Sequence, residues 1–323
     1  MKKHFELTLE GREWSVPVLV FWVIYLLLLG GQQALTRYGS PAGPGLGLLL
    51  NLVIMIALVL LEATFTIVLF RIVAPRLSIG GHPFAFSGSV GKYVGLNLKG
   101  ALLSIITLGI YAPWFLRNIL AYLTSHTTYR GAALQFMGKP KKLLKYFLLS
   151  LYLPLIVIIA GLSVVLVLVT LRGGNVSARG ATQTVTMLTT VVILLVLVPF
   201  ICLTLRWYVD VQWTDSRAQW RTSFWPFCGF VLGQLLLTLI TLGVYGPAGY
   251  LRVYRYFTER TVITRGDAQS ARLGFDGSIR SGFGLLWGQG LLCVITLGFA
   301  SPWAYARVAR WLFGATFLEQ QGT

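Results

Sequence analysis

The sequence carries little charge for its length, and acidic residues are its scarcest charged type. Only 11% of the 323 residues are charged, whereas an ordinary soluble domain carries roughly a quarter. The ten acids leave few candidates for general acid–base catalysis. No HExxH, Walker A, GxSxG or dinucleotide-binding motif is present either. We therefore expect neither a soluble globular protein nor an enzyme.

Cysteine and histidine are equally sparse. Cys202, Cys228 and Cys293 fall within or beside apolar segments and lack a Cys-x-x-Cys spacing, so they are typical of small packing residues. The histidines, His4, His82 and His126, have no metal-ligand spacing. We expect no disulfide, no metal site and no cofactor.

What the sequence does have is long apolar runs. Residues 16–31, 46–70, 143–171 and 183–205 hold almost no charge, and a bilayer span needs about 20 apolar residues. These runs predict four long membrane helices, the first of them uncleaved. The net charge of +17 sits in short segments beside the apolar runs, which indicates a positive-inside bias and not a nucleic-acid partner.

One phrase occurs three times, at residues 106–114 (Ile-Thr-Leu-Gly-Ile-Tyr-Ala-Pro-Trp), 240–248 and 295–303. In each copy a Gly ends one helix and a Pro begins the next, which predicts a tight helical hairpin. The predicted turn residues are Thr107, Gly109, Pro113, Thr241, Gly243, Pro247, Thr296, Gly298 and Pro302. The helices are about 20–24 Å long, against a hydrocarbon core of about 30 Å. They either cross a locally thinned bilayer or are re-entrant.

Short alternating segments that end in Gly, at residues 5–11, 84–88, 134–138 and 273–277, predict strands. Several have a partner strand across a turn, at residues 80–81, 130–131 and 265–266. Open strand edges cannot face lipid, so we expect all strands on one face of the membrane, in a small β-layer. Basic residues gather on that side, which assigns it, with both termini, to the cytoplasm.

The predicted fold class is an α-helical polytopic membrane protein of about ten membrane segments, four long and six short or re-entrant, with a small cytoplasmic β-layer. Its domains follow the repeat. Residues 1–138 form the first half, with a long helix pair, a β-hairpin and a short helix pair. Residues 139–277 form the second half. Residues 278–323 add a third short helix pair and a C-terminal strand.

Polar residues recur inside the short helix pairs. Arg117, Arg252 and Arg307 follow the Pro of each hairpin by four or five residues. Asn97, Gln234 and Gln289 lie at a similar depth on the preceding helices. An intramembrane guanidinium usually faces a bundle interior or a wet cavity, so these six residues are the candidate binding site for an anionic group. The alternative is that the arginines bond helix-end carbonyls or extend their head groups to the cytoplasm.

Glu62 is the one carboxylate deep within a long apolar run, and Lys99 lies at a comparable depth on the next helix. An unpaired intramembrane charge is costly. We therefore predict an intramembrane Glu62–Lys99 pair, in a structural role in preference to a proton relay.

The repeated phrase, the preceding Phe84-x-Phe-x-Gly88 and the downstream Tyr122-x-x-x-His126-Thr127 resemble the YjgN-like family of bacterial inner-membrane proteins of unknown function. The resemblance covers nearly the whole chain. It implies a multi-pass protein of the bacterial cytoplasmic membrane and supplies no activity, substrate or catalytic residue. The sequence departs from the pattern at Ala248 and at Phe299-Ala300, so the three hairpins need not be equivalent.

The leading functional interpretation is a transporter or channel-like protein that binds or passes a small or lipid-like, anionic substrate, because internal duplication and intramembrane charges fit transporter logic. The alternative is a membrane scaffold whose β-layer binds a partner protein or mediates oligomerisation. A membrane enzyme ranks third. The expected partners are membrane lipids and a second copy or a membrane-associated protein. The first two readings differ in whether the polar residues of the short helix pairs converge on one cavity.

Overall fold

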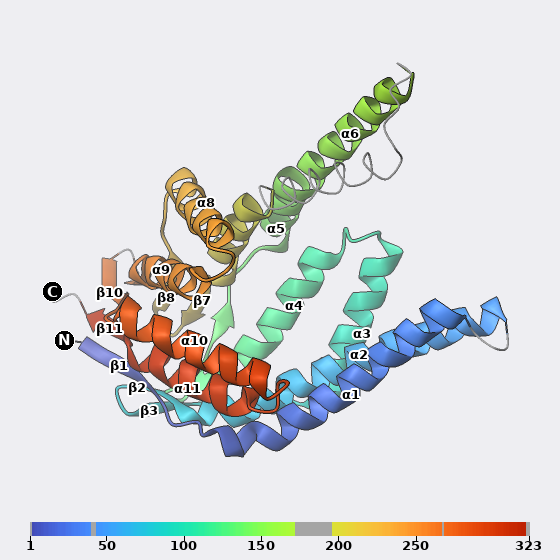
Figure 1. Cartoon of the computed structure of the whole chain (residues 1–323). Helices are drawn as coiled ribbons and strands as arrows, with labels where there is room; N and C mark the ends of the chain where they lie inside the picture. The colour runs from blue at the N-terminus through green and yellow to red at the C-terminus, as the bar shows by residue number, and fades with distance from the viewer. Residues whose placement is uncertain (1, 40–42, 172–195, 267, 321–323) are drawn as a thin grey trace.

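The chain alternates short strands with pairs of helices (Figure 1). The computed structural model describes residues 2–39, 43–171, 196–266 and 268–320. Within them the order strand, helix, helix, strand occurs five times, and we call each occurrence a unit. The predicted domain boundaries at residues 138 and 277 fall inside the third and fifth units, between a strand and the helix that follows it.

The units have the following bounds. Unit 1 holds β1 (Lys2–Leu7), α1 (Gly11–Tyr38), α2 (Pro44–Val73), the 3-10 turn η1 (Ala74–Arg76) and β2 (Leu77–Ile79). Unit 2 holds β3 (His82–Phe86), α3 (Val90–Ile106), α4 (Ala112–Ser125) and β4 (Thr127–Tyr129). Unit 3 holds β5 (Ala132–Ala133), β6 (Gln135–Phe136), α5 (Pro140–Tyr146), the π-helical segment η2 (Phe147–Tyr152), α6 (Leu153–Leu171), the helix Val196–Tyr208 and β7 (Val211–Trp213). Unit 4 holds β8 (Ser216–Trp220), α8 (Phe224–Ile240), α9 (Gly246–Glu259) and β9 (Thr261–Arg265). Unit 5 holds β10 (Ala268–Phe275), α10 (Ile279–Ile295), α11 (Ser301–Gly314) and β11 (Thr316–Gln320).

The eleven strands of the described residues belong to one antiparallel sheet with the order β5-β4-β3-β2-β1-β11-β10-β9-β8-β7-β6. The first strand pairs with the last, with Lys2 opposite Glu319 and His4 opposite Phe317. The strands at the two edges, β5 and β6, are separated along the chain by Leu134 alone. The two edges therefore lie next to each other, and the sheet curls round into a near-closed ring, which we call the strand ring.

A Phe packed on a Gly ends a strand in three units. A Cβ added to Gly88, Gly138 or Gly277 would collide with the ring of the Phe two residues earlier. Two of these glycines also accept a hydrogen bond from an arginine of the preceding unit. Arg71 donates from Nε and Nη2 to the carbonyl of Gly88 (3.2 and 2.7 Å), and Arg255 donates from Nη2 to the carbonyl of Gly277 (2.8 Å). These contacts join unit 1 to unit 2 and unit 4 to unit 5.

The three Ile-Thr-Leu-Gly phrases form the same helical hairpin turn. The hydroxyls of Thr107, Thr241 and Thr296 each donate to the carbonyl four residues back (2.7–2.8 Å) and accept the backbone N–H four residues ahead (3.0–3.1 Å). The next residue is a Leu in the left-handed region, with φ between 48° and 50°. The Gly that follows donates its N–H to the carbonyl five residues back (2.7 Å), the 6→1 bond of a Schellman motif. One Thr thus forms hydrogen bonds with the end of the first helix and with the start of the second helix in each pair.

The buried apolar residues form four clusters spread around the strand ring. They centre on Ile67 with Tyr93, on Leu143 with Trp207, on Cys202 with Phe227, and on Leu251 with Phe275. Each cluster joins the helices of one unit to a helix or strand of the next, and α11 packs on α1 to complete the circuit. Stability therefore comes from neighbouring units packing together, as in repeat proteins.

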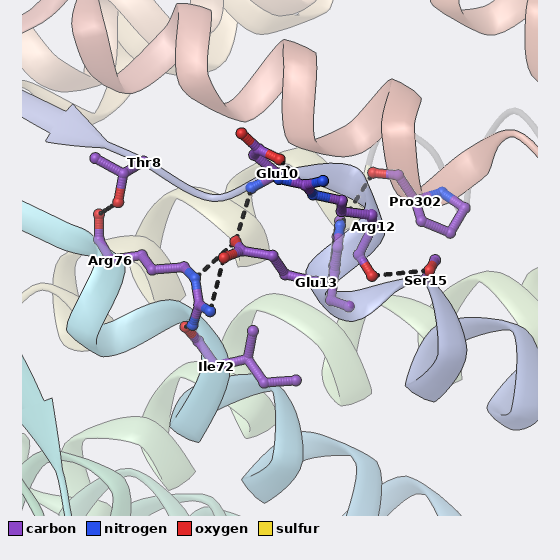
Figure 2. A network of polar contacts seen from close by, with 9 residues as sticks. Thr8, Glu10, Arg12, Glu13, Ser15, Ile72, Arg76 and Pro302 are labelled. Carbon is purple, nitrogen blue, oxygen red and sulfur yellow. Dashed lines mark hydrogen bonds and ion pairs between the residues drawn. The ribbon is translucent and has the colours of Figure 1, made fainter.

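A network of polar contacts joins the start of α1 to the segment that follows α2 in unit 1 (Figure 2). Glu13, in the first turn of α1, accepts two hydrogen bonds from Arg76 at the end of η1, the 3-10 turn that follows α2 (2.7 and 2.9 Å). Arg76 also donates to the carbonyl of Ile72 (2.8 Å), and its own carbonyl accepts the backbone N–H of Thr8 (3.0 Å). A bidentate Arg–carboxylate pair fixes orientation as well as distance, so this network sets the angle at which α1 and α2 leave the sheet.

The predicted fold class is wrong. The described residues contain ten α-helices numbered α1–α6 and α8–α11, of which the short pairs are only 14–17 residues long, together with an eleven-stranded sheet. This sheet does not fit an α-helical polytopic membrane protein of about ten membrane segments with a small β-layer. The apolarity of the short helices led to the error, together with strands of two to eight residues that look like isolated turns until their long-range pairing is known.

Three described helices are long and apolar enough to cross a membrane by length and composition, Gly11–Tyr38, Gly45–Arg76 and Pro140–Gly161. They coincide with three of the four predicted long runs and indicate that the chain associates with a membrane. The fourth predicted run, 183–205, lies mostly outside the described residues, and its described end belongs to the helix Val196–Tyr208. In Figure 1, α1 and α2 extend from the sheet in one direction and α6 in another.

Candidate functional site

A cavity of about 380 Å³ lies inside the strand ring. Every strand except β3 and β6 contributes to its wall, directly or through an adjoining turn. Much of the wall consists of cross-strand pairs with both partners facing inward, namely Lys3 with Leu318, Tyr129 with Ala132, Trp213 with Ser216 and Ile263 with Ala271. Because side chains alternate between the two faces of a strand, these pairs define one inward face. Ring closure therefore creates the cavity.

The cavity is basic. Lys3, Arg130 and Arg265 contribute three cations to the lining, which contains no Asp or Glu. The stem of Lys3 passes over Gly80, with Cδ 3.2 Å from where a Cβ on that Gly would lie. The Arg130 guanidinium sits 5.7 Å from the centre of the Tyr129 ring. Arg265 approaches Asp215 at 3.9 Å, but both side chains are more than 70% exposed, so water screens this pair.

Acidic residues elsewhere around the ring form ion pairs with arginines. Glu13 pairs with Arg76 at 2.7 Å and Asp210 with Arg217 at 2.6 Å, while Glu319 reaches Arg272 at 3.9 Å. Hydrogen bonding to Asp210 raises the pKa of Arg217 above its ordinary value. With ten acids against 27 lysines and arginines in the chain, most basic residues lack a carboxylate partner. Lys3 and Arg130 of the cavity belong to this excess within the described chain, and Arg265 has only its exposed contact with Asp215.

Two turns at the cavity carry an unusual backbone. Arg130 and Thr214 line the cavity and have φ values of 52° and 45°, in the left-handed region that non-glycine residues rarely adopt. Gly131, which follows Arg130, also has a positive φ of 81°, and two such residues in succession are typical of the tight turns that suit the twist of a two-stranded ribbon. The turn geometry therefore holds Arg130 at the rim of the cavity.

The three arginines predicted as an anion site do not come together in a shared cavity. Arg117, Arg252 and Arg307 are exposed residues on α4, α9 and α11, and none lines the cavities found among the described residues. Arg252 lies over the ring of Tyr245, with its Cζ 5.5 Å from the ring centre.

The amide residues of the same prediction are dispersed. Asn97 donates to the carbonyl of Tyr93 one turn back (2.8 Å). Gln234 accepts a hydrogen bond from the Tyr245 hydroxyl (2.7 Å). Gln289 is half-buried on α10 and lines none of the described cavities. The six residues thus lie on separate helices without a common groove.

The structure does not join Glu62 and Lys99. Both are exposed, on α2 and α3 respectively, and the ion pairs found in the described part of the chain do not include one between them. The hydroxyl of Thr66 bonds the backbone carbonyl of Glu62 (2.8 Å). As for metals, no group of three His, Cys, Asp or Glu side chains among the described residues is placed to hold an ion.

Comparison with known families identifies the chain. The model of a family described as a bacterial protein of unknown function (DUF898) matches residues 81–261, more than half of the sequence. The chain belongs to this family. It is the family that the sequence resemblance pointed to. No curated relative matches the chain, and no solved structure does.

The stretch matched by the DUF898 model runs from the β2–β3 turn to the first residue of β9 and so covers units 2 and 3 and most of unit 4. It includes Tyr129, Arg130 and Trp213 of the cavity wall, whereas Lys3 and Arg265 lie outside it. The cavity therefore combines residues of the family-defining stretch with residues of the first and last strands.

Reasoning from the sequence missed the cavity although it placed its basic residues on the strand side. Lys3, Arg130 and Arg265 stand in or beside predicted strands, and two of them directly precede a turn Gly, Gly131 and Gly266. A basic residue directly before a turn Gly was the feature of the sequence that could have indicated the cavity. What the sequence lacked was the pairing of β1 with β11, which brings Lys3 to the same cavity as Arg130.

Proposed function

We propose that this protein is a membrane-anchored binding protein for a small anionic ligand, which it holds in the basic cavity of its strand ring. The observation that carries the proposal is the lining, in which three cations and no acid stand beside the rings of Tyr129 and Trp213. A volume of about 380 Å³ suits a small organic molecule. Guanidinium groups recognise phosphate and carboxylate through paired hydrogen bonds. The favoured ligand is therefore a phosphate or carboxylate with an apolar or aromatic portion.

The membrane part of the proposal rests on the long helices. Apolar side chains of α1 and α2 are widely exposed, for example Leu27 at 70% and Leu48 at 75%, and lipid chains are the partner that such surfaces fit. Lysines and arginines gather beside the strands, which supports a bacterial inner-membrane protein whose helices cross more than once and whose strand ring and termini face the cytoplasm.

Passage of the ligand across the membrane is not part of this proposal. A conduit built from the short helix pairs would need their polar side chains to share a cavity. Arg117, Arg252 and Arg307 are exposed on separate helices, so the geometry favours binding at the strand ring over conduction between these helices. Unchanged uptake of the bound anion into vesicles that contain the protein would agree with this view.

The test uses isothermal titration calorimetry of the purified full-length protein with phenyl phosphate. We expect saturable binding that the combined Lys3→Gln, Arg130→Gln and Arg265→Gln variant weakens by at least about tenfold, since a hydrogen bond to a charged group contributes roughly 1.5–3 kcal/mol. Lys2→Gln is the matched control. Lys2 neighbours Lys3 on the same strand but points to the other face, over the ring of Phe317 at 4.3 Å. Equal binding by the wild type and the triple variant would refute the proposal.

A further inference from the structure

A second cleft lies between units 3 and 4, apart from the ring cavity. It has a volume of about 360 Å³ and is lined by Lys142, Arg206, Asp210, Trp220, Arg221 and Thr222 among others. Lys142 belongs to the first turn of α5, Arg206 to the end of the helix Val196–Tyr208, and Trp220 ends β8. Its lining shares no residue with that of the ring cavity.

The cleft has an excess of positive charge. Its one carboxylate, Asp210, already accepts two hydrogen bonds from Arg217, at 2.6 and 2.7 Å. The guanidiniums of Arg206 and Arg221 make no ion pair within the described chain. The ammonium of Lys142 lies 5.9 Å from the ring of Tyr146 and has no carboxylate partner there either. Three cations thus face a cleft whose acid is neutralised by a fourth.

A buried donor in the same wall is unpartnered. Trp220 is only 4% exposed, and its indole Nε1–H has no hydrogen-bond partner in the described part of the chain. Leaving a buried donor without an acceptor costs about 1–3 kcal/mol, and native structures contain few such groups. The Nε1 atom is itself buried, and the indole ring packs on Phe227 and Phe257, so it reports on the wall of the cleft and does not itself contact a ligand. The three cations are what indicate that the ligand is an anion.

Unit 4 differs from units 2 and 5 where its first strand ends. In units 2 and 5 the strand ends in Phe-x-Gly, and an arginine of the preceding unit, Arg71 or Arg255, bonds the Gly carbonyl. In unit 4 the corresponding residues are Trp220 and Thr222. Arg206, near the end of the helix Val196–Tyr208, makes no such bond to Thr222 within the described chain. Its guanidinium lines the cleft.

We propose that this cleft binds a phosphate group. Arg206 and Arg221 supply planar donors that match phosphate oxygens, and Lys142 adds a point charge. Two sources share this chemistry, the headgroup of an anionic phospholipid and a free phosphate. The headgroup is plausible on position, because Lys142 and Arg206 stand at ends of apolar helices, where membrane phosphates meet basic residues. The proposal does not depend on the ring cavity.

The indole proton of Trp220 provides a local readout. In full-length protein labelled with ¹⁵N-tryptophan, the Trp220→Phe variant identifies this resonance. We expect inorganic phosphate, dihexanoylphosphatidylglycerol or both to shift it saturably. A shift with the phospholipid alone assigns the site to headgroups, and a shift with phosphate assigns it to the free ion or to both sources. Dihexanoylglycerol, which lacks the phosphate, should leave the resonance in place, and an equal shift with it would overturn the proposal.

Substitutions of the basic residues provide the second test of the proposal. Arg206→Gln combined with Arg221→Gln should weaken the titration by at least about tenfold, as expected from losing charge-assisted hydrogen bonds. Lys142→Gln, on an exposed turn, provides a variant with little risk to folding and should weaken binding about threefold, a surface-charge effect. Arg280→Gln is the matched control, since Arg280 is exposed in the first turn of α10 in unit 5. Unaltered binding in the double variant and in Lys142→Gln would refute the phosphate site.

Discussion

At the scale of single residues, the units are joined by a small set of contacts used repeatedly. Where a strand ends in Phe-x-Gly, the missing Cβ of the Gly makes room for the Phe ring, and the Gly carbonyl is free to accept an arginine from the preceding unit. Unit 4 replaces both residues of this contact, with Trp220 and Thr222. A departure from the repeat thus coincides with the second basic cleft.

Gly277→Ala is expected to destabilise the protein by about 1–3 kcal/mol. The added methyl would collide with the Phe275 ring and approach Cβ of Ala315 at 3.0 Å. Gly284→Ala is the control, because nothing lies within 4 Å of its would-be Cβ on α10 and Ala is the better helix residue by roughly 0.5–1 kcal/mol. Thermal unfolding followed by circular dichroism in detergent measures both. A loss of stability no larger for Gly277→Ala than for Gly284→Ala would contradict the packing argument.

At the scale of elements, the three helical hairpins share one turn whose tip carries an exposed leucine. Leu108, Leu242 and Leu297 are 89–94% exposed and sit in the left-handed region. The Thr before each of them accepts the first free N–H of the next helix while bonding the end of the previous one. Each Thr therefore stabilises the point where the two helices of a pair meet, beside side-chain contacts between the helices such as Phe115 of α4 on Gly100 of α3.

Thr241→Val should lower stability by about 0.5–2 kcal/mol, in the range for loss of a helix cap. The valine keeps the shape but leaves the N–H of Tyr245 without its 3.0 Å acceptor. Thr241→Ser keeps the hydroxyl and should retain most of the stability. Hydrogen exchange at the Tyr245 amide is the local measurement. Faster exchange in the serine variant than in the valine variant would be inconsistent with the capping role.

At the scale of the whole molecule, local features were predictable from the sequence and long-range pairing was not. The Gly and Pro signals located the helical hairpins, and apolar alternation located segments such as 84–88 and 273–277, where β3 and β10 end. Nothing local indicates that Lys2 lies opposite Glu319, because strand register depends on contacts across the entire chain. The placement of the predicted anion-site arginines depends on the same long-range arrangement. Arg117, Arg252 and Arg307 repeat in sequence, but the helices that carry them are spread around the ring.

Ring closure predicts a specific cross-link. With Cys293 replaced by Ser, Lys2→Cys and Glu319→Cys should be joined by a short bismaleimide within one chain, because facing residues of antiparallel strands have Cβ atoms about 5 Å apart. Lys2→Cys with Arg37→Cys is the control, since Arg37 lies near the far end of α1, about 40 Å along the helix. Denaturing electrophoresis measures the product. A cross-linked species only at the mass of a dimer would mean that the first and last strands pair between chains.

The pairing of β1 with β11 also determines at which stage of synthesis the sheet can close. During translation β1 leaves the ribosome first and gains β2 early, but its other edge has no partner until β11 has been synthesised. A nascent or truncated chain therefore exposes two open strand edges, the kind of surface on which chains aggregate and quality-control factors act. Pairing of β11 with β1 and β10 covers both edges in one step, so protection from aggregation and the basic cavity of the strand ring arise together.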